Sequence, residues 1–165
     1  MLTVVMGGKA SPGASVTSWA MTLGWPRPVL AVDADPAGGD LMVGMLPGRV
    51  RADHGLMTWA ATTRGGMSLI RAAEELPKHS VTFTEAPGAW LMPGFATAMQ
   101  GLSMTEEGWA RLAGALERAD GVLGRDAIVD CGRVGAAHTA WPVVSSAAPT
   151  TAASATRGCA TSEDS

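Results

Sequence analysis

Four features are scarce in this sequence, and each absence excludes a class of protein. Two cysteines, Cys131 and Cys159, are too few for a disulfide framework, and their separation matches no metal-binding spacing. Lysine and arginine number 12 against 15 aspartates and glutamates, so nucleic acid would meet no general basic field. No apolar run approaches the roughly 18 to 20 residues of a membrane span. Tyrosine is absent, and we interpret the ten methionines and six tryptophans as core and interface filler.

The 165 residues predict one folded domain with a real core, since 47% of them are apolar and 16% are charged. Only six residues precede the first loop and none of them is basic, so we expect no signal peptide. Two cysteines fit a reducing compartment, and we therefore expect a cytoplasmic protein.

The first forty residues have the pattern of a strand, a loop, a helix and a second strand. An apolar run at 2–6 enters a loop of small residues at 7–13, and a second apolar run at 29–32 ends at Asp33. The segment between them has helical periodicity, which predicts an amphipathic helix with one face on the sheet. Four apolar residues at i, i+3, i+4 and i+7 define that face: Val16, Trp19, Ala20 and Leu23.

A glycine-rich loop leading into a helix is suited to hold phosphate, because its N–H groups converge and the helix end adds about half a positive charge. Ser15 stands where this helix begins. Asp33 and Asp35 follow the second strand, where an α/β sheet opens its ligand crevice, and carboxylates there hold Mg²⁺ through water or orient a water. Each pattern alone is also typical of a tight turn or a helix cap. Together they favour a nucleotide site.

The middle of the chain predicts further helices and short strands. A helix is expected from about 53 to 65, and a second one, capped by Ser68, should bury four side chains. Two segments, 80–84 and 89–92, are short enough for strands and are bounded by prolines. The side chains that the second helix should bury are Leu69, Ile70, Ala73 and Leu76.

The clearest helix of the second half spans 103–119, where Ser103 and Glu106 form a capping box. Its buried stripe and its solvated face are both regular, which predicts an amphipathic helix. The stripe is Trp109, Leu112, Ala113 and Leu116, and the charged face is Glu107, Arg111, Glu117 and Arg118. An apolar strand ending in Asp130 follows, and parallel βαβ units place such strand ends on one edge.

These motifs resemble the deviant Walker A ATPases of the ParA/MinD family, particularly the chromosome-partitioning-like proteins of actinobacteria. The resemblance lies in KASPGAS at 9–15, DADPAGGD at 33–40 and IVDCG at 128–132, and it covers roughly residues 1–144. It implies a three-layer α/β/α P-loop NTPase-like domain with a mostly parallel sheet, incomplete at the C-terminus. It further implies ATP and Mg²⁺ as cofactors and a homodimer formed on nucleotide binding, with DNA or a partner protein as a further contact.

The resemblance also implies a role for each site residue. Lys9 falls on the signature lysine that reaches the partner's phosphates, and it joins Asp33 and Asp35 as the catalytic set, in which an aspartate orients the attacking water. Mg²⁺ would be held by Ser15, Asp33 and Asp130. The phosphate cradle would consist of Gly8, Lys9, Ala10, Ser11, Gly13, Ala14, Ser15 and Val16.

One position departs from the family pattern, because Ala14 stands where the family has the loop lysine. A charge-assisted contact of roughly 1.5 to 3 kcal/mol is thereby missing. Pro12 also removes one N–H donor from the cradle. We therefore expect nucleotide binding and leave ATP hydrolysis open.

The implied function is ATP-dependent partitioning or positioning. Two alternatives stay open: a non-hydrolysing nucleotide-sensing scaffold with a degenerate loop, and a small-molecule kinase or ligase of the same superfamily. Residues 145–165 are of low complexity, rich in alanine, serine and threonine, and resemble either a disordered tail or the result of truncation. We favour truncation, and the domain is expected to end near residue 144.

Overall fold

The computed structural model describes residues 1–8, 13–38, 54–83 and 86–133, and the expected tail at 145–165 lies outside this part. The described strands form one five-stranded sheet in the order β1-β5-β2-β4-β3. Four strands run parallel, and β3 pairs antiparallel with β4. The bounds are β1 Leu2–Gly7, β2 Val29–Asp33, β3 Val81–Thr82, β4 Ala89–Met92 and β5 Asp126–Arg133.

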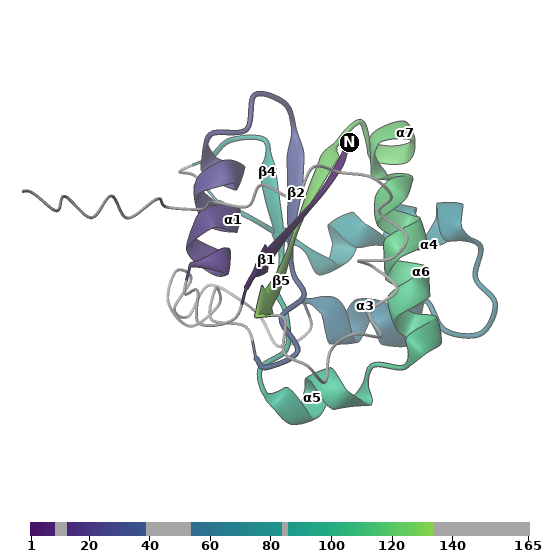
Figure 1. The fold of residues 1–165 in the computed structure, drawn as a ribbon. Coiled ribbons are helices and arrows are strands. Elements are labelled where there is room, and N and C mark those ends of the chain that lie inside the picture. The colour runs from purple at the N-terminus through teal and green to yellow at the C-terminus, as the bar shows by residue number, and fades with distance from the viewer. Residues whose placement is uncertain (9–12, 39–53, 84–85, 134–165) are drawn as a thin grey trace, which may run out of the picture.

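Helices cover both faces of this sheet. Among the described helices, Figure 1 shows α1 on one face, α3, α4, α6 and α7 on the other, and α5 below the carboxyl ends of the strands. The expected three-layer architecture with a mostly parallel sheet is thus confirmed. The helices are α1 Ala14–Leu23, α3 Leu56–Thr62, α4 Leu69–Glu75, the 3₁₀ helix η1 Leu76–His79, α5 Ala98–Ser103, α6 Glu106–Glu117 and α7 Ala119–Leu123.

Strand β2 supplies side chains to both cores because it is central and buried on both faces. Leu30 and Val32 join the larger cluster, which lies under α3, α4, α6 and α7. Val29 and Ala31 point the other way and join the smaller cluster on the α1 face. Alternation with period two explains this division, and it fixes which strand ends carry polar residues.

Our prediction of which face of α1 is buried is wrong. Val16 is 64% exposed and Leu23 is 46% exposed, and Ala20 is also exposed. The buried side chains are instead Ser18 and Thr22. Their hydroxyls donate to the carbonyl oxygens of Ala14 at 2.9 Å and Ser18 at 2.8 Å, so each is satisfied within the helix. Because these small side chains leave no polar group unpaired, α1 can lie against the sheet on its polar stripe.

Trp19 is the one member of the expected stripe that packs inward. It is half-buried, and its ring lies 4.9 Å from the ring of Phe83, centre to centre. The apolar periodicity was therefore a correct indicator of the helix but not of the face that it buries.

In helix α4 the predicted cap at Ser68 is confirmed, but the predicted burial of Ile70 is wrong. The Ser68 hydroxyl accepts from the Arg71 N–H at 3.3 Å, as a capping serine should. Ile70, however, is 55% exposed, and the buried positions are Ala72, Ala73 and Leu76. The short helix turns its alanines to α6 and α7, which approach closely only where side chains are small.

The capping box at Ser103 and Glu106 is also wrong. Ser103 is the last residue of α5, and α6 begins at Glu106. The N-cap is Thr105, whose hydroxyl accepts from the Gly108 N–H at 3.1 Å. Thr105 has the extended backbone that a cap requires, so it replaces Ser103 in the same chemical role two residues later.

The stripe of α6 is confirmed, since its four expected residues are all buried. Arg111 departs from the expected solvated face: it is only 13% exposed, and its Nη1 donates to the Met67 carbonyl oxygen at 2.6 Å. Within the described ranges, no helix has the length and apolar character that a bilayer crossing demands.

Candidate functional site

The carboxyl ends of β2 and β5 bring two buried carboxylates together. Asp33 pairs in register with Asp130 in the parallel ladder, and the two residues are 0% and 1% exposed. The Ala34 N–H donates to the Asp130 carbonyl oxygen at 2.7 Å, which continues the pairing past the last residue of β2. Burial of two neighbouring carboxylates is costly unless donors or a cation compensate their charge. This edge is therefore chemically unusual for a protein core.

Asp130 retains an oxygen that the described residues do not satisfy. Its Oδ1 accepts from the Gly132 N–H at 2.9 Å, whereas its buried Oδ2 has no hydrogen-bond partner. An unsatisfied buried acceptor costs about 1–3 kcal/mol, and more when it is charged. Such an oxygen suits a cation or its bound water, which is the role that the resemblance implied for Asp130.

Asp35 lies directly against Gly132, near the carboxyl end of β5. Its Oδ1 accepts from the Ala37 N–H at 2.8 Å. Gly132 has φ +63°, and a Cβ placed there would be 2.1 Å from the Asp35 Cγ. Glycine is required at this position for both reasons, conformation and space. The Asp35 carboxylate is thus held at the end of β5, beside Asp130.

Gly94 lies against Asp33 on the other side of this edge, and we did not predict it as part of the site. A Cβ at Gly94 would lie 2.7 Å from the Asp33 Cγ, so the segment directly after β4 approaches Asp33 as closely as glycine allows. The Asp33 Oδ1 also accepts from the Asp35 N–H at 3.4 Å. The signal in the sequence was Pro93-Gly94 directly after a strand, since glycine there permits close backbone approach.

Cys131 is a buried thiol at this edge of the sheet. It lies between Asp130 and Gly132, is 3% exposed and is a free thiol. Burial, with smaller contributions from the charges of Asp130 and Asp35, raises the pKa of Cys131 to about 12. Because only a thiolate is a strong nucleophile or metal ligand, Cys131 stays protonated and inert near neutral pH.

The amino end of α1 lies at the same edge of the sheet (Figure 1). Gly13 is its N-cap with φ +118°, a left-handed conformation that favours glycine, and no side chain caps the helix. The first intrahelical bond runs from the Thr17 N–H to the Gly13 carbonyl oxygen at 2.8 Å. The N–H groups of Ala14, Ser15 and Val16 precede that bond, so they are available to an anion.

The expected site residues are therefore only partly placed. Gly8 and Gly13 are exposed, Ala14 and Ser15 are half-buried, and the Val16 side chain points to solvent. Lys9, Ala10 and Ser11 lie outside the described residues. The structure brings Asp33, Asp35 and Asp130 to one edge.

In the described part of the chain, no group of three or more histidine, cysteine, aspartate or glutamate side chains is arranged to hold a metal ion. A Mg²⁺ ion that is bound with a nucleotide needs no such group, because waters and phosphate oxygens fill most of its six positions. The unsatisfied oxygen of Asp130 and a hydroxyl such as that of Ser15 are the ligand types that Mg²⁺ takes in this setting. The donor set therefore fits a nucleotide-bound Mg²⁺ and does not fit a metal held by protein alone.

No family model matches this chain, and no curated protein matches it. Among solved structures, the chain is similar to a ParA family ATPase from Chlorobium tepidum TLS, with a TM-score of 0.58 and 22% sequence identity. The match covers 88% of this chain and 56% of that ATPase, so the chain spans little more than half its length. The likeness shows the fold: an α/β domain with a mostly parallel sheet, consistent with the P-loop NTPase-like class.

Proposed function

We propose that this protein binds ATP with Mg²⁺ at the carboxyl edge of β1, β2 and β5, in the manner of a ParA-like nucleotide-binding protein. The observation that carries the proposal is the pair Asp33 and Asp130, buried side by side with one Asp130 oxygen unsatisfied. The uncapped amino end of α1 at the same edge supplies the N–H donors that phosphate oxygens require. The ParA-like fold supports this assignment.

Each residue has a role in the proposal. Ser15 and Asp130 hold Mg²⁺, Asp130 through water, and the ion neutralises phosphate charge. Asp35 or Asp33 orients the attacking water if ATP is hydrolysed. Lys9 supplies a positive charge to the phosphates, within one protomer or across a homodimer.

The biological role that we propose is ATP-dependent partitioning or positioning of a cargo by a homodimer in the cytoplasm. We infer the homodimer from Lys9, which the resemblance places on the lysine that reaches the partner's phosphates, and DNA or a partner protein would provide the cargo contact. The net charge of −3 favours a partner protein or a local basic patch over a general DNA-binding surface.

A non-hydrolysing nucleotide sensor is the second candidate, and Ala14 is the observation that favours it. Ala14 is the first residue of α1, and it offers the site a backbone N–H but no charge. Because no positive side chain at position 14 contacts the β and γ phosphates, we expect the protein to retain nucleotide binding more readily than stabilisation of the transition state for hydrolysis.

Calorimetry of ATP and ADP binding with Mg²⁺ tests the proposal. Wild type should bind ATP, and Lys9→Ala should weaken binding at least about tenfold, a difference of ~1.4 kcal/mol. Arg71→Ala is a matched control, because it removes an exposed cation on α4, in the helical layer opposite α1. No heat of binding with wild type would overturn the nucleotide site.

Turnover distinguishes the two candidates. Mg²⁺-dependent release of phosphate that is lost in Asp35→Ala supports the ATPase, whereas binding without turnover supports the sensor. Asp120→Ala serves as the control, because Asp120 is an exposed carboxylate on α7.

A further inference from the structure

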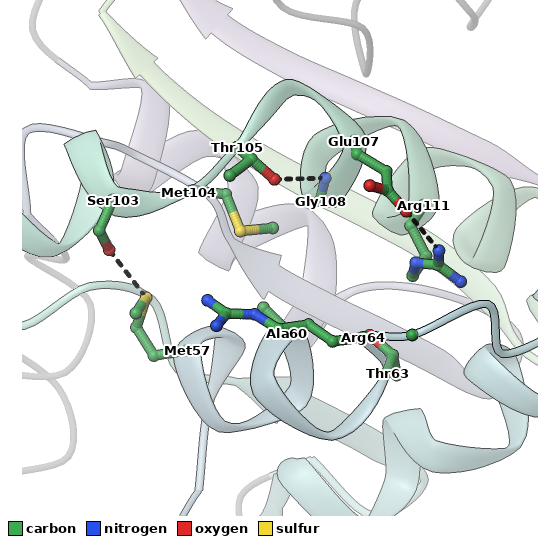
Figure 2. A pocket seen from close by; sticks show the side chains of 11 residues that line it. Met57, Ala60, Thr63, Arg64, Ser103, Met104, Thr105, Glu107, Gly108 and Arg111 are labelled. Carbon is green, nitrogen blue, oxygen red and sulfur yellow. Dashed lines mark hydrogen bonds and ion pairs between the residues drawn. The ribbon is translucent and has the colours of Figure 1, made fainter.

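A cavity of about 390 Å³ lies in the helical layer opposite α1, between the carboxyl end of α3 and the amino end of α6 (Figure 2). Its size is within the range of small-molecule pockets, roughly 300–1,000 Å³. None of the nucleotide-site residues lines it. A ligand in this cavity would bind apart from the proposed ATP site.

Two arginines line this cavity, and they differ in whether a carboxylate pairs with them. The Arg111 guanidinium is fixed: Nη1 donates to the Met67 carbonyl oxygen at 2.6 Å, and Nη2 to the Glu107 Oε1 at 2.8 Å. Arg64 follows α3 and is exposed, and within the described part of the chain no carboxylate pairs with it. Figure 2 shows its side chain extending along the cavity toward the end lined by Met57. The cavity thus holds one positive charge that no described carboxylate neutralises.

A buried hydroxyl adds an independent indication of a ligand. Thr63 lines the cavity, is 0% exposed, and its Oγ1 has no hydrogen-bond partner among the described residues. A helix-terminal threonine normally finds a backbone carbonyl for this proton. Leaving the hydroxyl unpaired costs about 1–3 kcal/mol, a cost that a ligand oxygen would remove.

The remaining wall has an apolar part beside polar residues, which are Ser103, Thr105 and the Glu107 carboxylate that pairs with Arg111. Met57, Ala60 and Met104 line the cavity, and the Ser103 hydroxyl lies 3.9 Å from the Met57 sulfur. Methionine side chains adapt to ligands of different shape. A ligand that fits this wall therefore has an apolar part as well as a charged one.

We propose that this cavity binds a small organic anion, a phosphate monoester or a carboxylate with an apolar body. Arg64 pairs with the anionic group, the Thr63 hydroxyl donates to one of its oxygens, and the apolar body packs on Met57 and Met104. Phosphate and carboxylate are both anions whose oxygens can accept hydrogen bonds from Arg64 and Thr63, and separate titrations distinguish them.

The test uses the full chain labelled with ¹³C at its methionine methyl groups. Phenyl phosphate and benzoate are titrated in turn, and the Met57 and Met104 signals, assigned by Met→Leu variants, are followed by NMR. We expect saturable shifts of both signals with at least one of the two anions, and the stronger binder identifies the anionic group. Absence of saturable shifts with both anions would overturn the proposal.

Two further probes test the two parts of the ligand. Benzyl alcohol, which lacks the charge, should cause no saturable shifts of the Met57 and Met104 signals. If it binds as tightly as the two anions, the cavity is an apolar pocket and the proposal is contradicted. Inorganic phosphate should bind at least about tenfold more weakly than phenyl phosphate, since it cannot contact the methionines. Shifts confined to Met6, near the end of β1, would place the anion at the other edge of the sheet and also overturn it.

Variants test the assigned residues. Arg64→Gln should weaken binding about tenfold or more, because it removes a charge-assisted contact. Arg71→Gln is the matched control on α4, and it should leave binding unchanged. Equal affinity of the Arg64→Gln variant and wild type would contradict the role of Arg64.

Thr63→Val separates a binding hydroxyl from a structural one. It keeps the shape and removes an unpaired buried hydroxyl, so the thermal midpoint should stay equal or rise. Affinity should nevertheless fall about threefold or more and return in Thr63→Ser. Unchanged affinity in Thr63→Val would show that the hydroxyl does not contact the ligand.

Discussion

The two halves of the candidate nucleotide site differ in how closely their neighbours enclose them. At the carboxyl ends of β2 and β5, Gly132 and Gly94 are in contact with Asp35 and Asp33, with no space for a Cβ. At the amino end of α1, a Cβ on Gly8 or Gly13 would meet no atom of the described residues within 4 Å. The aspartate edge is therefore held in place by close packing, whereas the amino end of α1 presents mainly backbone groups. A charge can therefore be absent at Ala14 while the fold is retained, whereas the aspartate edge tolerates little change.

The largest effect should come from filling the enclosed half. Gly132→Ala puts a Cβ 2.1 Å from the Asp35 Cγ and forces alanine to adopt φ +63°, so the free energy of unfolding should fall by about 2–4 kcal/mol. Gly94→Ala should behave similarly. Urea unfolding measures both.

Gly8→Ala and Gly121→Ala are the matched controls, because a Cβ at either position has open space. Each should change stability by less than about 1 kcal/mol. A Gly132→Ala variant as stable as these controls would show that the edge is not enclosed.

The next effect concerns the open half. Ala14→Lys restores a charge at the first residue of α1, and nucleotide affinity should rise roughly 10- to 150-fold, the equivalent of 1.5–3 kcal/mol. Ala20→Lys adds the same charge farther along the exposed face of α1 and should have little effect. Calorimetry with ATP and Mg²⁺ compares the two, and equal affinities would mean that position 14 does not face phosphate.

Asp130→Asn tests whether the enclosed half holds the metal. The substitution removes the charge of the unsatisfied Oδ2, so the Mg²⁺-dependent part of ATP affinity should fall about tenfold. The free energy of unfolding should change by less than about 1 kcal/mol, because two effects oppose each other. Asparagine accepts a weaker hydrogen bond from the Gly132 N–H, but it also removes the repulsion between Asp130 and the neighbouring aspartates. Asp120→Asn, on the exposed surface, is the control. Affinity that stays independent of Mg²⁺ in wild type and variant would contradict a metal role.

The smallest effect is a pH dependence from Cys131. Its pKa is about 12 in the folded protein, where burial disfavours the thiolate, against 9.0 for an ordinary cysteine. The unfolded chain therefore loses this proton first, and stability that is present below pH 9 is lost as the pH rises from about 9 to 12. At pH 10 the loss should be about 1 kcal/mol.

Cys131→Ala should flatten this alkaline decline in urea unfolding between pH 8 and 10. The sequence contains no tyrosine, so no phenol titrates in the same range. A decline equally steep in wild type and in the alanine variant would mean that the thiol is accessible and that the edge is less enclosed.

Much of the site edge was predictable from local pattern. The apolar runs at 29–32 and 127–129 end in acids, and parallel strands bring their carboxyl ends to one edge. What could not be predicted is the closeness of Gly94 and Gly132, because a clash depends on residues that are distant in the sequence. The same holds for Thr105, which caps α6 because α5 ends two residues before it, at Ser103.

The sequence by itself determined the main strands, the helices α1, α3, α4 and α6 and the placement of the aspartates at strand ends, because these follow from periodicity and from short-range chemistry. The short helices α5 and α7 were not predicted. The tertiary structure alone decided which side of α1 is buried, how Arg111 is bound and where a second cavity forms. The physical reason is that a helix can satisfy small polar side chains by itself, as Ser18 and Thr22 show. Its apolar stripe then does not dictate which face meets the sheet, and the packing of the neighbouring elements does.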